Sequence, residues 1–439
     1  MGIMNRMLKF GGLVIVTIMS LISCSQENEL RIAEDSIDRT SKIISLAEAE
    51  ADLNKLLDDI YDIQSTRVSC SRKKVIANAF TIEEGSCDTR SGEITPIIVH
   101  VFNFENQEGF ALMAGNRELP SLLALADSGE IKETAQIDNP GVAIFLENME
   151  RVYIEEITSS VAPGTFDDYT VYGNWENIVY KQGGHCVVKW GQGSPYNKFC
   201  PIKGGENCVT GCVATAVAQF MSILRYPSSY NGYIFDWDEM TYNAYAELCT
   251  TDGANQIARL MYELGKASNL NMSYDTAANG GSGANAEHIP RTLKNFGYSN
   301  GGSLKNYNTE TVVSELKNGY SVLVGGFSHK TEETFLGITV NTKYTGGHRW
   351  LCHGLLERRR TVSTYTSKGE LKNTTTESLW YPLCNWGWNG YCDGYYLSKA
   401  FNSNNGPSYS TSTRGSEVEN GSEDYNFKYN ITAVTGIRK

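Results

Sequence analysis

The stretch that decides the fold reads Gly205-Glu-Asn-Cys208-Val-Thr-Gly211-Cys212-Val-Ala-Thr-Ala-Val-Ala-Gln-Phe220. A polar, glycine-containing loop runs directly into residues 213–224, which are mostly small or apolar and contain neither glycine nor proline. That pattern predicts a buried helix with Cys212 at its start. The first turn of a helix has unpaired N–H groups and the positive end of the dipole, which favour a thiolate. We therefore expect a lowered thiol pKa and a nucleophile at Cys212.

A cysteine nucleophile needs a base, a group that orients the base, and donors for the developing oxyanion. His348 follows a Gly-Gly pair and opens an apolar run that predicts a strand. Asn385 and Trp386 follow a second apolar run. An asparagine carbonyl fixes an imidazole tautomer, and a tryptophan shields that hydrogen bond from water. Gln192, upstream of the helix, supplies a side-chain amide for the oxyanion.

Several motifs follow one another between residues 190 and 397: Trp-x-Gln, Pro-Tyr-Asn, Gly-Cys-Val-Ala-Thr-Ala, Gly-Gly-His and Asn-Trp-Gly-Trp-x-Gly-x-x-Asp-Gly. This order resembles the C10 (streptopain-like) family of cysteine peptidases. The resemblance implies a papain-like fold and an endopeptidase that acts on proteins or peptides without a cofactor or metal ion. It also implies the site residues: Cys212 as nucleophile, His348 as general base and acid, Gln192 as oxyanion donor, and Asn385 and Trp386 to orient and cover His348.

The chain departs from the family pattern at two places. Cys352-His353-Gly354 stands where the family has an apolar run ending in Asp-Gly, so His353 is a second candidate base. We favour His348, because the Gly-Gly before it matches the family. The second departure is residues 357–378, rich in Thr, Ser, Lys and Arg, which we expect to form a solvated hairpin at the rim. Such a hairpin either contacts substrate or only decorates the surface, and we favour the second.

The predicted fold class is α+β, a papain-like domain preceded by a smaller α+β pro-domain. We place a lipoprotein signal peptide at 1–24, an acidic pro-domain with its linker at 25–165, and the catalytic domain at 166–439. The pro-domain opens with the capping box Ser45-Leu-Ala-Glu48 before apolar residues at helical spacing. The predicted helices lie at 45–60, 142–157, 213–224, 257–266, 286–295 and 311–317. The predicted strands lie at 96–104, 109–114, 320–327, 348–356, 379–386, 395–398 and 428–436. Residues 402–424, rich in Ser, Asn and Gly, predict a loop.

The chain begins with a targeting pattern. Arg6 and Lys9 precede an apolar run at 10–22, and Cys24 directly follows Leu-Ile-Ser, as in a bacterial lipoprotein cleavage site. We therefore expect a precursor anchored in the bacterial envelope through lipid on Cys24, with the mature enzyme released by a cut near residues 163–168. Residues 25–165 carry 26 acidic and 12 basic residues, and residues 166–439 carry 24 of each. No basic stripe exists, so nucleic acid is excluded as a partner.

Eleven cysteines leave other interpretations open. Cys70 with Cys87, and Cys384 with Cys392, are candidate local disulfides, although sequence cannot fix the connectivity. A zinc site built from the cysteines at 200, 208 and 212, or from the cluster at 348–353, is one alternative function, but the spacings match no common metal pattern. A catalytically decayed lipoprotein that only binds a ligand is the other. A thiol-directed epoxide and a chelator distinguish the three.

Overall fold

The computed structural model describes residues 43–65, 73–88, 94–117, 119–132, 137–159, 168–181, 187–327, 332–336, 338–341, 347–402 and 431–439. Residues from Ile44 onward form one compact unit. The expected signal peptide with Cys24 lies outside the described residues, as do nearly all of the linker at 162–168 and the loop at 402–424. None of the described helices is long and apolar enough to cross a membrane.

Residues 44–159, the N-terminal domain, combine an antiparallel sheet with two helices. Its elements are α2 (Leu46–Ser65), β1 (Ile76–Asp88), β2 (Ile94–Phe104), β3 (Phe110–Ala114), β4 (Leu122–Ala126) and α3 (Pro140–Ser159). The capping box forms as predicted, since the Glu48 N–H donates to Ser45 Oγ at 3.3 Å. The apolar stripe of α2 is buried at Leu53, Leu56, Leu57 and Ile60. The sequence predicted β2, β3 and both helices but missed β1 and β4.

The second domain follows the predicted order of helices first and strands later, which confirms the α+β class. Its main elements are β5 (Asp168–Tyr172), β6 (Glu176–Lys181), α4 (Cys212–Leu224), α6 (Thr251–Gly265), α7 (Ile289–Asn295), β11 (Asn300–Asn306), α8 (Thr309–Lys317), β12 (Val322–Phe327), β15 (Gly347–Thr366), β16 (Leu371–Asn385), β17 (Gly394–Tyr396) and β18 (Thr432–Arg438). Shorter elements are β7 (Ile202–Lys203), β8 (Glu206–Asn207), β9 (Ser229–Tyr230), β10 (Tyr233–Ile234), α5 (Trp237–Met240), β13 (Glu332–Phe335) and β14 (Ile338–Asn341).

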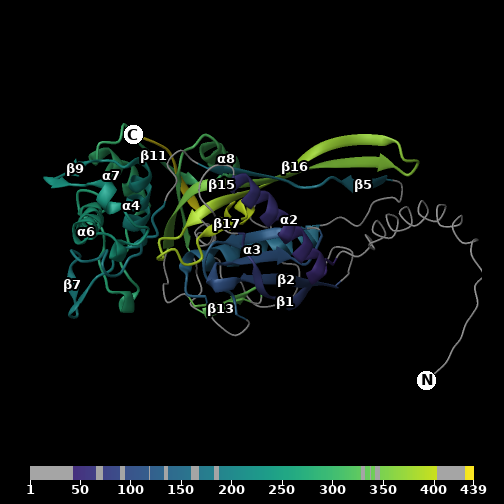
Figure 1. Cartoon of the computed structure of the whole chain (residues 1–439), viewed down its shortest axis with the longest axis horizontal. Helices are drawn as coiled ribbons and strands as arrows, with labels where there is room; N and C mark the ends of the chain where they lie inside the picture. Colours follow the sequence, from purple (N-terminus) through teal and green to yellow (C-terminus); the bar gives the residue numbers. More distant parts are fainter. Residues whose placement is uncertain are drawn as a thin grey trace, which may run out of the picture. The chain divides into compact units, whose positions relative to one another are not determined.

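One sheet runs through both domains (Figure 1). The described strands follow the order β1-β2-β3-β4-β17-β16-β15-β12-β18-β11. The junction is the antiparallel pair β4 and β17, in which Ala126 lies opposite Gly394. Glycine is required there, because a Cβ on Gly394 would lie 2.3 Å from the Leu125 carbonyl oxygen. The N-terminal domain is therefore continuous in its hydrogen bonding with the strands that carry the predicted site.

The central strands are buried on both faces, and side chains alternate between two cores. On β15, Trp350 and Cys352 belong to the core shared with the N-terminal domain. Leu351 belongs to the other core, with Val213 and the rest of α4. His348 has the parity of Trp350, and Arg349 has the parity of Leu351. This alternation decides which catalytic group faces which domain.

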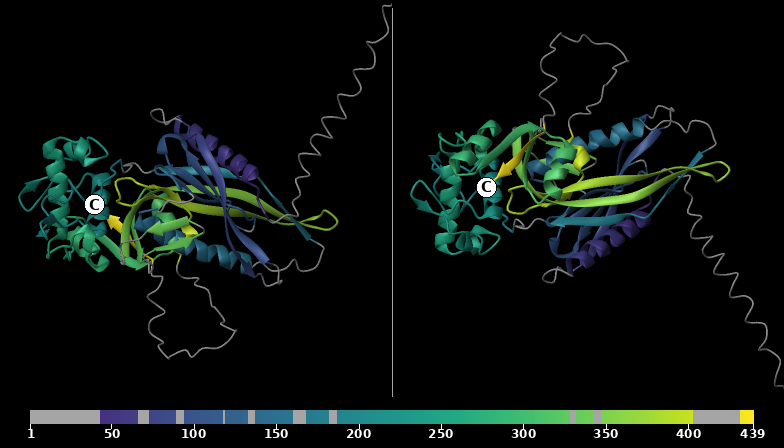
Figure 2. Two further views of the ribbon diagram at one scale, coloured as in Figure 1. Left: turned by 90° about the horizontal axis from the view of Figure 1, so that it is seen from below. Right: turned by 90° about the horizontal axis from the view of Figure 1, so that it is seen from above.

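Residues 357–378 form the outer part of a long β15–β16 hairpin, with β5 and β6 beside it on β15 (Figure 2). The prediction of a hairpin is confirmed. Its base, however, neither contacts substrate nor decorates the surface, which were the two expected roles. Arg358 is only 1% exposed. Its Nη2 lies 2.9 Å from Asp52 Oδ1 on α2, and its Nε donates to Asn177 on β6 at 3.0 Å. The hairpin base is thus an ionic contact with the N-terminal domain.

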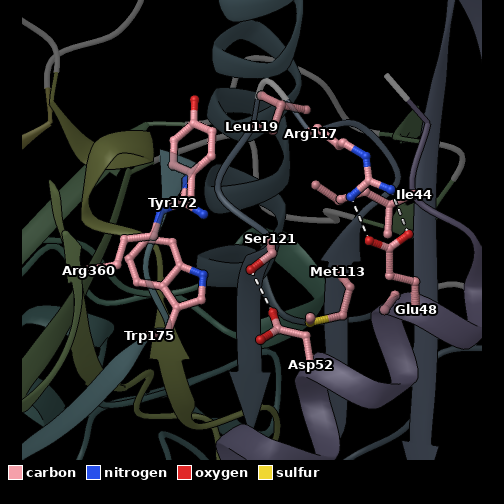
Figure 3. A pocket seen from close by; sticks show the side chains of 12 residues that line it. Ile44, Glu48, Asp52, Met113, Arg117, Leu119, Ser121, Tyr172, Trp175 and Arg360 are labelled. Carbon is pink, nitrogen blue, oxygen red and sulfur yellow. Dashed lines mark hydrogen bonds and ion pairs between the residues drawn. The ribbon is translucent and has the colours of Figure 1, made fainter. Parts of the chain in front are cut away.

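A cavity of about 200 Å³ lies beside this contact (Figure 3). On one wall Arg117 forms a bidentate pair with Glu48 of α2, at 2.5 and 2.8 Å. On the other, the Arg360 guanidinium stacks over Tyr172 and Trp175, 4.1 and 4.3 Å from the ring centres. The walls come from both domains, so this cavity belongs to their interface.

Candidate active site

Cys212 is the first residue of α4, as predicted. The residue before it, Gly211, has φ 83°, and a Cβ there would lie 2.8 Å from the Ser282 carbonyl oxygen. Only glycine fits this turn easily. The turn brings the thiol of Cys212 to 3.8 Å from the Gly347 carbonyl oxygen, at the start of β15.

The expected lowering of the Cys212 pKa is wrong for this conformation. Burial of the sulfur dominates and raises the pKa of the thiol above its ordinary value. Hydrogen bonds from the N–H groups of Arg349 and Val213, and the charge of Arg349, act in the opposite direction. The helix-start effect is therefore present but outweighed, and the thiol stays protonated near neutral pH.

His348 is buried, 4% exposed, at the beginning of β15. Its Nε2 lies 2.8 Å from the Trp386 carbonyl oxygen. A carbonyl only accepts, so the neutral ring carries its proton on Nε2 and leaves Nδ1 as an acceptor. The pKa of His348 is lowered to about 4, mainly by burial and also by the Arg349 charge, although the bond to Trp386 opposes both. The imidazole is therefore neutral at physiological pH.

The two residues expected to orient and cover His348 occupy other roles here. Asn385 Oδ1 accepts from Gln219 at 2.8 Å and from the Gly387 N–H at 3.1 Å, while its Nδ2 donates to the Val188 carbonyl at 2.8 Å. The Trp386 backbone, rather than the Asn385 amide, holds the imidazole.

The ring of Trp386 packs on Trp350 and Tyr396, each 4.9 Å away between ring centres. The rings nearest His348 are Trp350, nearly parallel at 6.2 Å, and Trp388, edge-on at 6.1 Å. Trp350 was missed by sequence reasoning, because it looks like an ordinary core residue of the strand.

A cavity of about 220 Å³ brings three of the predicted residues together. Cys212, His348 and Gln192 line it. The other lining residues are Gly280, Gly281, Ser282, Gly283, Gly347, Trp388 and Pro140. Pro140 is the first residue of α3, so the N-terminal domain contributes directly to the wall. His353 lies further along β15 and is not among the lining residues.

The N-terminal domain also holds the segment 386–393, which we call the active-site loop. Ser128 Oγ donates to the Gly390 carbonyl and accepts from the Cys392 N–H at 3.1 Å. Asn139 Nδ2 donates to the Tyr391 carbonyl at 2.7 Å. Gly141 is tight against Trp386, since a Cβ there would lie 2.0 Å from the indole ring.

Asp393 is a site residue that sequence reasoning did not select. Its Oδ1 accepts from the Trp386 N–H at 2.8 Å, and it thereby fixes the peptide whose carbonyl binds His348. Burial raises the pKa of this carboxyl to about 7, and the bond to Trp386 opposes the rise. The Asp-Gly at the end of the tryptophan motif was the available signal.

The structure also bears on the expected disulfides and on the alternative of a metal site. Cys384 and Cys392 are both free thiols, which contradicts the expected disulfide. Cys384 instead lies opposite Cys352 across β15 and β16, with the sulfurs 3.8 Å apart. Cys70 and the Cys87 side chain lie outside what the structure describes. Within the described residues, no three His, Cys, Asp or Glu side chains form a group able to hold a metal ion.

The match to known families follows this geometry. Residues 190–396, from the strictly buried Trp190 to the end of β17, match the model of the Peptidase C10 family. Residues 190–396 belong to the C10 family of peptidases. Residues 65–153 match the model of the Spi protease inhibitor. The inhibitor-like match falls on the N-terminal domain, which corresponds to a pro-domain.

Individual relatives agree with the family match. Streptopain from Streptococcus pyogenes serotype M1 is 25% identical over 361 residues, which cover 71% of this chain and 76% of streptopain. The thiol protease/hemagglutinin PrtT of Porphyromonas gingivalis is 26% identical over 161 residues, 35% of this chain and 18% of PrtT. These matches identify the C10 domain as a cysteine peptidase.

A solved structure supports the fold. A fragment of prointerpain A from Prevotella intermedia superposes with a TM-score of 0.51 at 22% identity, covering 82% of this chain and 99% of that fragment. At this identity the likeness shows the fold alone. It extends over both domains, which confirms the predicted arrangement of a peptidase domain preceded by a smaller α+β domain.

Proposed function

We propose that this chain is the latent precursor of a secreted cysteine endopeptidase that cleaves proteins or peptides through Cys212 and His348. Residues 25–165 are the pro-domain with its linker, and residues 166–439 are the catalytic domain. The observation that carries the proposal is the shared cavity: a cysteine at a helix start, a histidine whose Nδ1 can accept a proton, and a glutamine amide all line it. The family match supplies the reaction class.

The proposed chemistry follows from these groups. The Cys212 thiol gives its proton to His348 Nδ1, and the thiolate attacks the carbonyl carbon of the scissile peptide. The Gln192 amide and the Cys212 N–H stabilise the oxyanion. The imidazolium then protonates the leaving amine, and water hydrolyses the thioester with His348 acting again as base. Trp386 positions His348 through its carbonyl, and Asn385 supports the active-site loop by accepting from the Gly387 N–H.

Latency is the second half of the proposal. His348 shares the face of β15 with Trp350, toward the N-terminal domain, whereas Cys212 lies on α4 at the opposite face. Pro140 lines the same cavity as Cys212 and His348, and Gly141 lies tightly against Trp386. With a raised thiol pKa and a lowered imidazole pKa, the pair is neutral and inactive. Removal of the pro-domain frees the active-site loop, and His348 turns to Cys212.

The location of the precursor follows from the beginning of the sequence. Lipid on Cys24 anchors it to the bacterial envelope, and Cys24 belongs to the part of the chain that processing removes. A cut near residues 163–168 separates the anchor from Cys212, while β5 and β6 stay with the catalytic domain because they pair with β15. Activation and release are then one event.

Paired variants test this function. Cys212→Ala is expected to abolish cleavage of casein under reducing conditions, whereas Cys249→Ala, which changes a half-buried thiol outside the cavity, is expected to keep it. His348→Ala is expected to cost several orders of magnitude in rate, and His353→Asp little. Cleavage by the Cys212→Ala chain would overturn the proposal and favour a different nucleophile. An inactive wild-type chain that still binds peptide would favour the decayed binding lipoprotein.

A further inference from the structure

Arg349 is a buried cation next to the catalytic pair. Its side chain is 6% exposed. Nη1 donates to the Leu323 carbonyl at 3.2 Å, and Nη2 donates to Thr432 Oγ1 at 2.8 Å. These partners are neutral, and within the described part of the chain no carboxylate pairs with Arg349. Burying a guanidinium without a counter-charge is costly, so a buried unpaired arginine needs an explanation.

The surrounding strands are shaped to hold this guanidinium. Gly325 on β12 lies directly opposite Arg349. A Cβ on Gly325 would lie 2.6 Å from both Cζ and Nε of Arg349. The space that a side chain would fill on β12 is therefore occupied by the arginine. Thr432, on the next strand β18, completes the cradle with its hydroxyl.

Arg349 lies on the Cys212 side of the strand. It shares the face of β15 with Leu351, which packs in the core of α4, and Cys212 is the first residue of α4. The Arg349 N–H donates to the Cys212 sulfur, and the guanidinium charge acts on both Cys212 and His348. The other side chains that line the cavity, including Gln192, Ser282 and Trp388, are uncharged. Arg349 is therefore a fixed positive charge that acts on a forming thiolate, and the side chains lining the cavity provide no second one.

We propose that Arg349 is a positioning residue for catalysis, the built-in counter-charge of the Cys212 thiolate. The proposal rests on the proposed role of Cys212 as nucleophile. Arg349 keeps its proton throughout: the thiol proton goes to His348 Nδ1 or to water, and the guanidinium stabilises the negative sulfur left behind. It also disfavours the imidazolium. Removing the charge would therefore raise the pKa of the Cys212 thiol further, which moves alkylation of Cys212 to higher pH.

The test measures alkylation of Cys212 by iodoacetamide as a function of pH, in the intact chain, by mass spectrometry of the peptide that contains Cys212. Arg349→Met keeps the apolar stem and removes the charge. Its alkylation midpoint is expected to rise by about one pH unit, because a nearby opposite charge lowers a pKa by roughly that amount or more. Arg349→Lys keeps a positive charge at this position, so its alkylation midpoint is expected to lie close to that of the wild type. A merely structural arginine would lower the melting temperature without moving the midpoint.

A second variant protects the test against misfolding of Arg349→Met. Gly325→Ala leaves the charge in the chain but pushes the guanidinium out of its cradle, so a smaller rise in the midpoint is expected. Gly354→Ala, also in the central sheet, is the matched control, since its nearest atoms are 3.2 Å away on Leu383 and Arg349 is not among them. Equal midpoints in the wild type, Arg349→Met and Gly325→Ala would overturn the proposal. Because the readout is alkylation, it is independent of whether the Cys212→Ala chain cleaves casein.

Discussion

Besides the β4–β17 strand pair, the N-terminal domain holds the catalytic domain at the active-site loop and at the hairpin base, and these two contacts are built differently. At the active-site loop the contact is made through backbone groups: Ser128 and Asn139 bind main-chain atoms, and Gly141 presses on an indole ring. At the hairpin base it is made through charges, with Arg358 paired to Asp52 (Figure 3 shows Asp52 and the adjoining cavity). Only the first contact leads to His348, through the Trp386 carbonyl. We infer that the contact at the active-site loop keeps the precursor inactive. The contact at the hairpin base only holds the two domains together.

The largest expected effect in a test of this comparison comes from variants that release the active-site loop. The double variant Ser128→Ala, Asn139→Ala removes three hydrogen bonds to the loop and the cap of α3, in which Asn139 Oδ1 accepts from the Gly141 N–H. At about 1 kcal/mol each, the loss amounts to about 3 kcal/mol, or about a hundredfold in the population of the released loop. Labelling of Cys212 by a thiol-directed epoxide in the uncut chain is expected to speed up accordingly.

The matched control for this variant is Ser121→Ala. Ser121 also makes two hydrogen bonds, to Asp52 and Arg358, but at the hairpin base. Its labelling rate is expected to equal that of the wild type. If both variants label alike, latency does not reside in the active-site loop.

A smaller effect is expected at the hairpin base. Arg358→Met leaves Asp52 without its ion pair and Asn177 without a donor, at a cost of about 2 kcal/mol because Asp52 is partly exposed. The melting temperature of the precursor should fall by several degrees, while Cys212 in the uncut chain is labelled as slowly as in the wild type. Glu48→Gln, which breaks a pair that is one-third exposed, should cost at most about 1 kcal/mol. Activation of the uncut Arg358→Met chain would show that holding the domains together and keeping the precursor inactive are not separate.

The smallest effect concerns pH. His348 has its pKa lowered from 6.5 to about 4 in the folded chain, so the unfolded chain binds more protons between these values and stability rises with pH there. Asp393 has its pKa raised from 3.8 to about 7, so the folded chain binds more protons and stability falls as pH rises through that window. The two slopes oppose each other.

Urea unfolding of the precursor between pH 4 and pH 7 measures this balance. Asp393→Asn removes the falling contribution, so its stability should rise more steeply with pH than that of the wild type. His348→Ala should show the reverse. An unchanged slope in Asp393→Asn would mean that this carboxyl is ionised in the folded chain.

Local patterns gave most of the fold and the members of the site, and distant pairing gave the rest. The helix at 213–224 and the strand at 348–356 follow from apolar runs and turn residues that are close in sequence. The pairing of β4 with β17 joins residues about 270 positions apart and depends on a glycine whose neighbour cannot be read from the chain. The grouping of Cys212, His348 and Gln192 was predicted through the family motifs.

The details of the site that were not predicted are contacts made in the latent state. Asn385 was expected to bind His348, but its amide is held by Gln219 and Val188, and the Trp386 carbonyl takes its place. The thiol pKa was expected to fall because the helix start is visible in the sequence, whereas the burial that raises it depends on tertiary packing around the sulfur. The sequence motifs identify the residues of the catalytic site. The structure adds the contacts that these residues make in the uncut precursor.

The most direct test of this account is the labelling of Cys212 by a thiol-directed epoxide during processing of the wild-type chain, followed by mass spectrometry of the intact and shortened forms in one sample. The account predicts that Cys212 is labelled far faster in chains that have lost the N-terminal domain than in full-length chains, and that peptidase activity appears in step with the fast labelling. Equal labelling of Cys212 in the full-length chain, or activity before shortening, would contradict it.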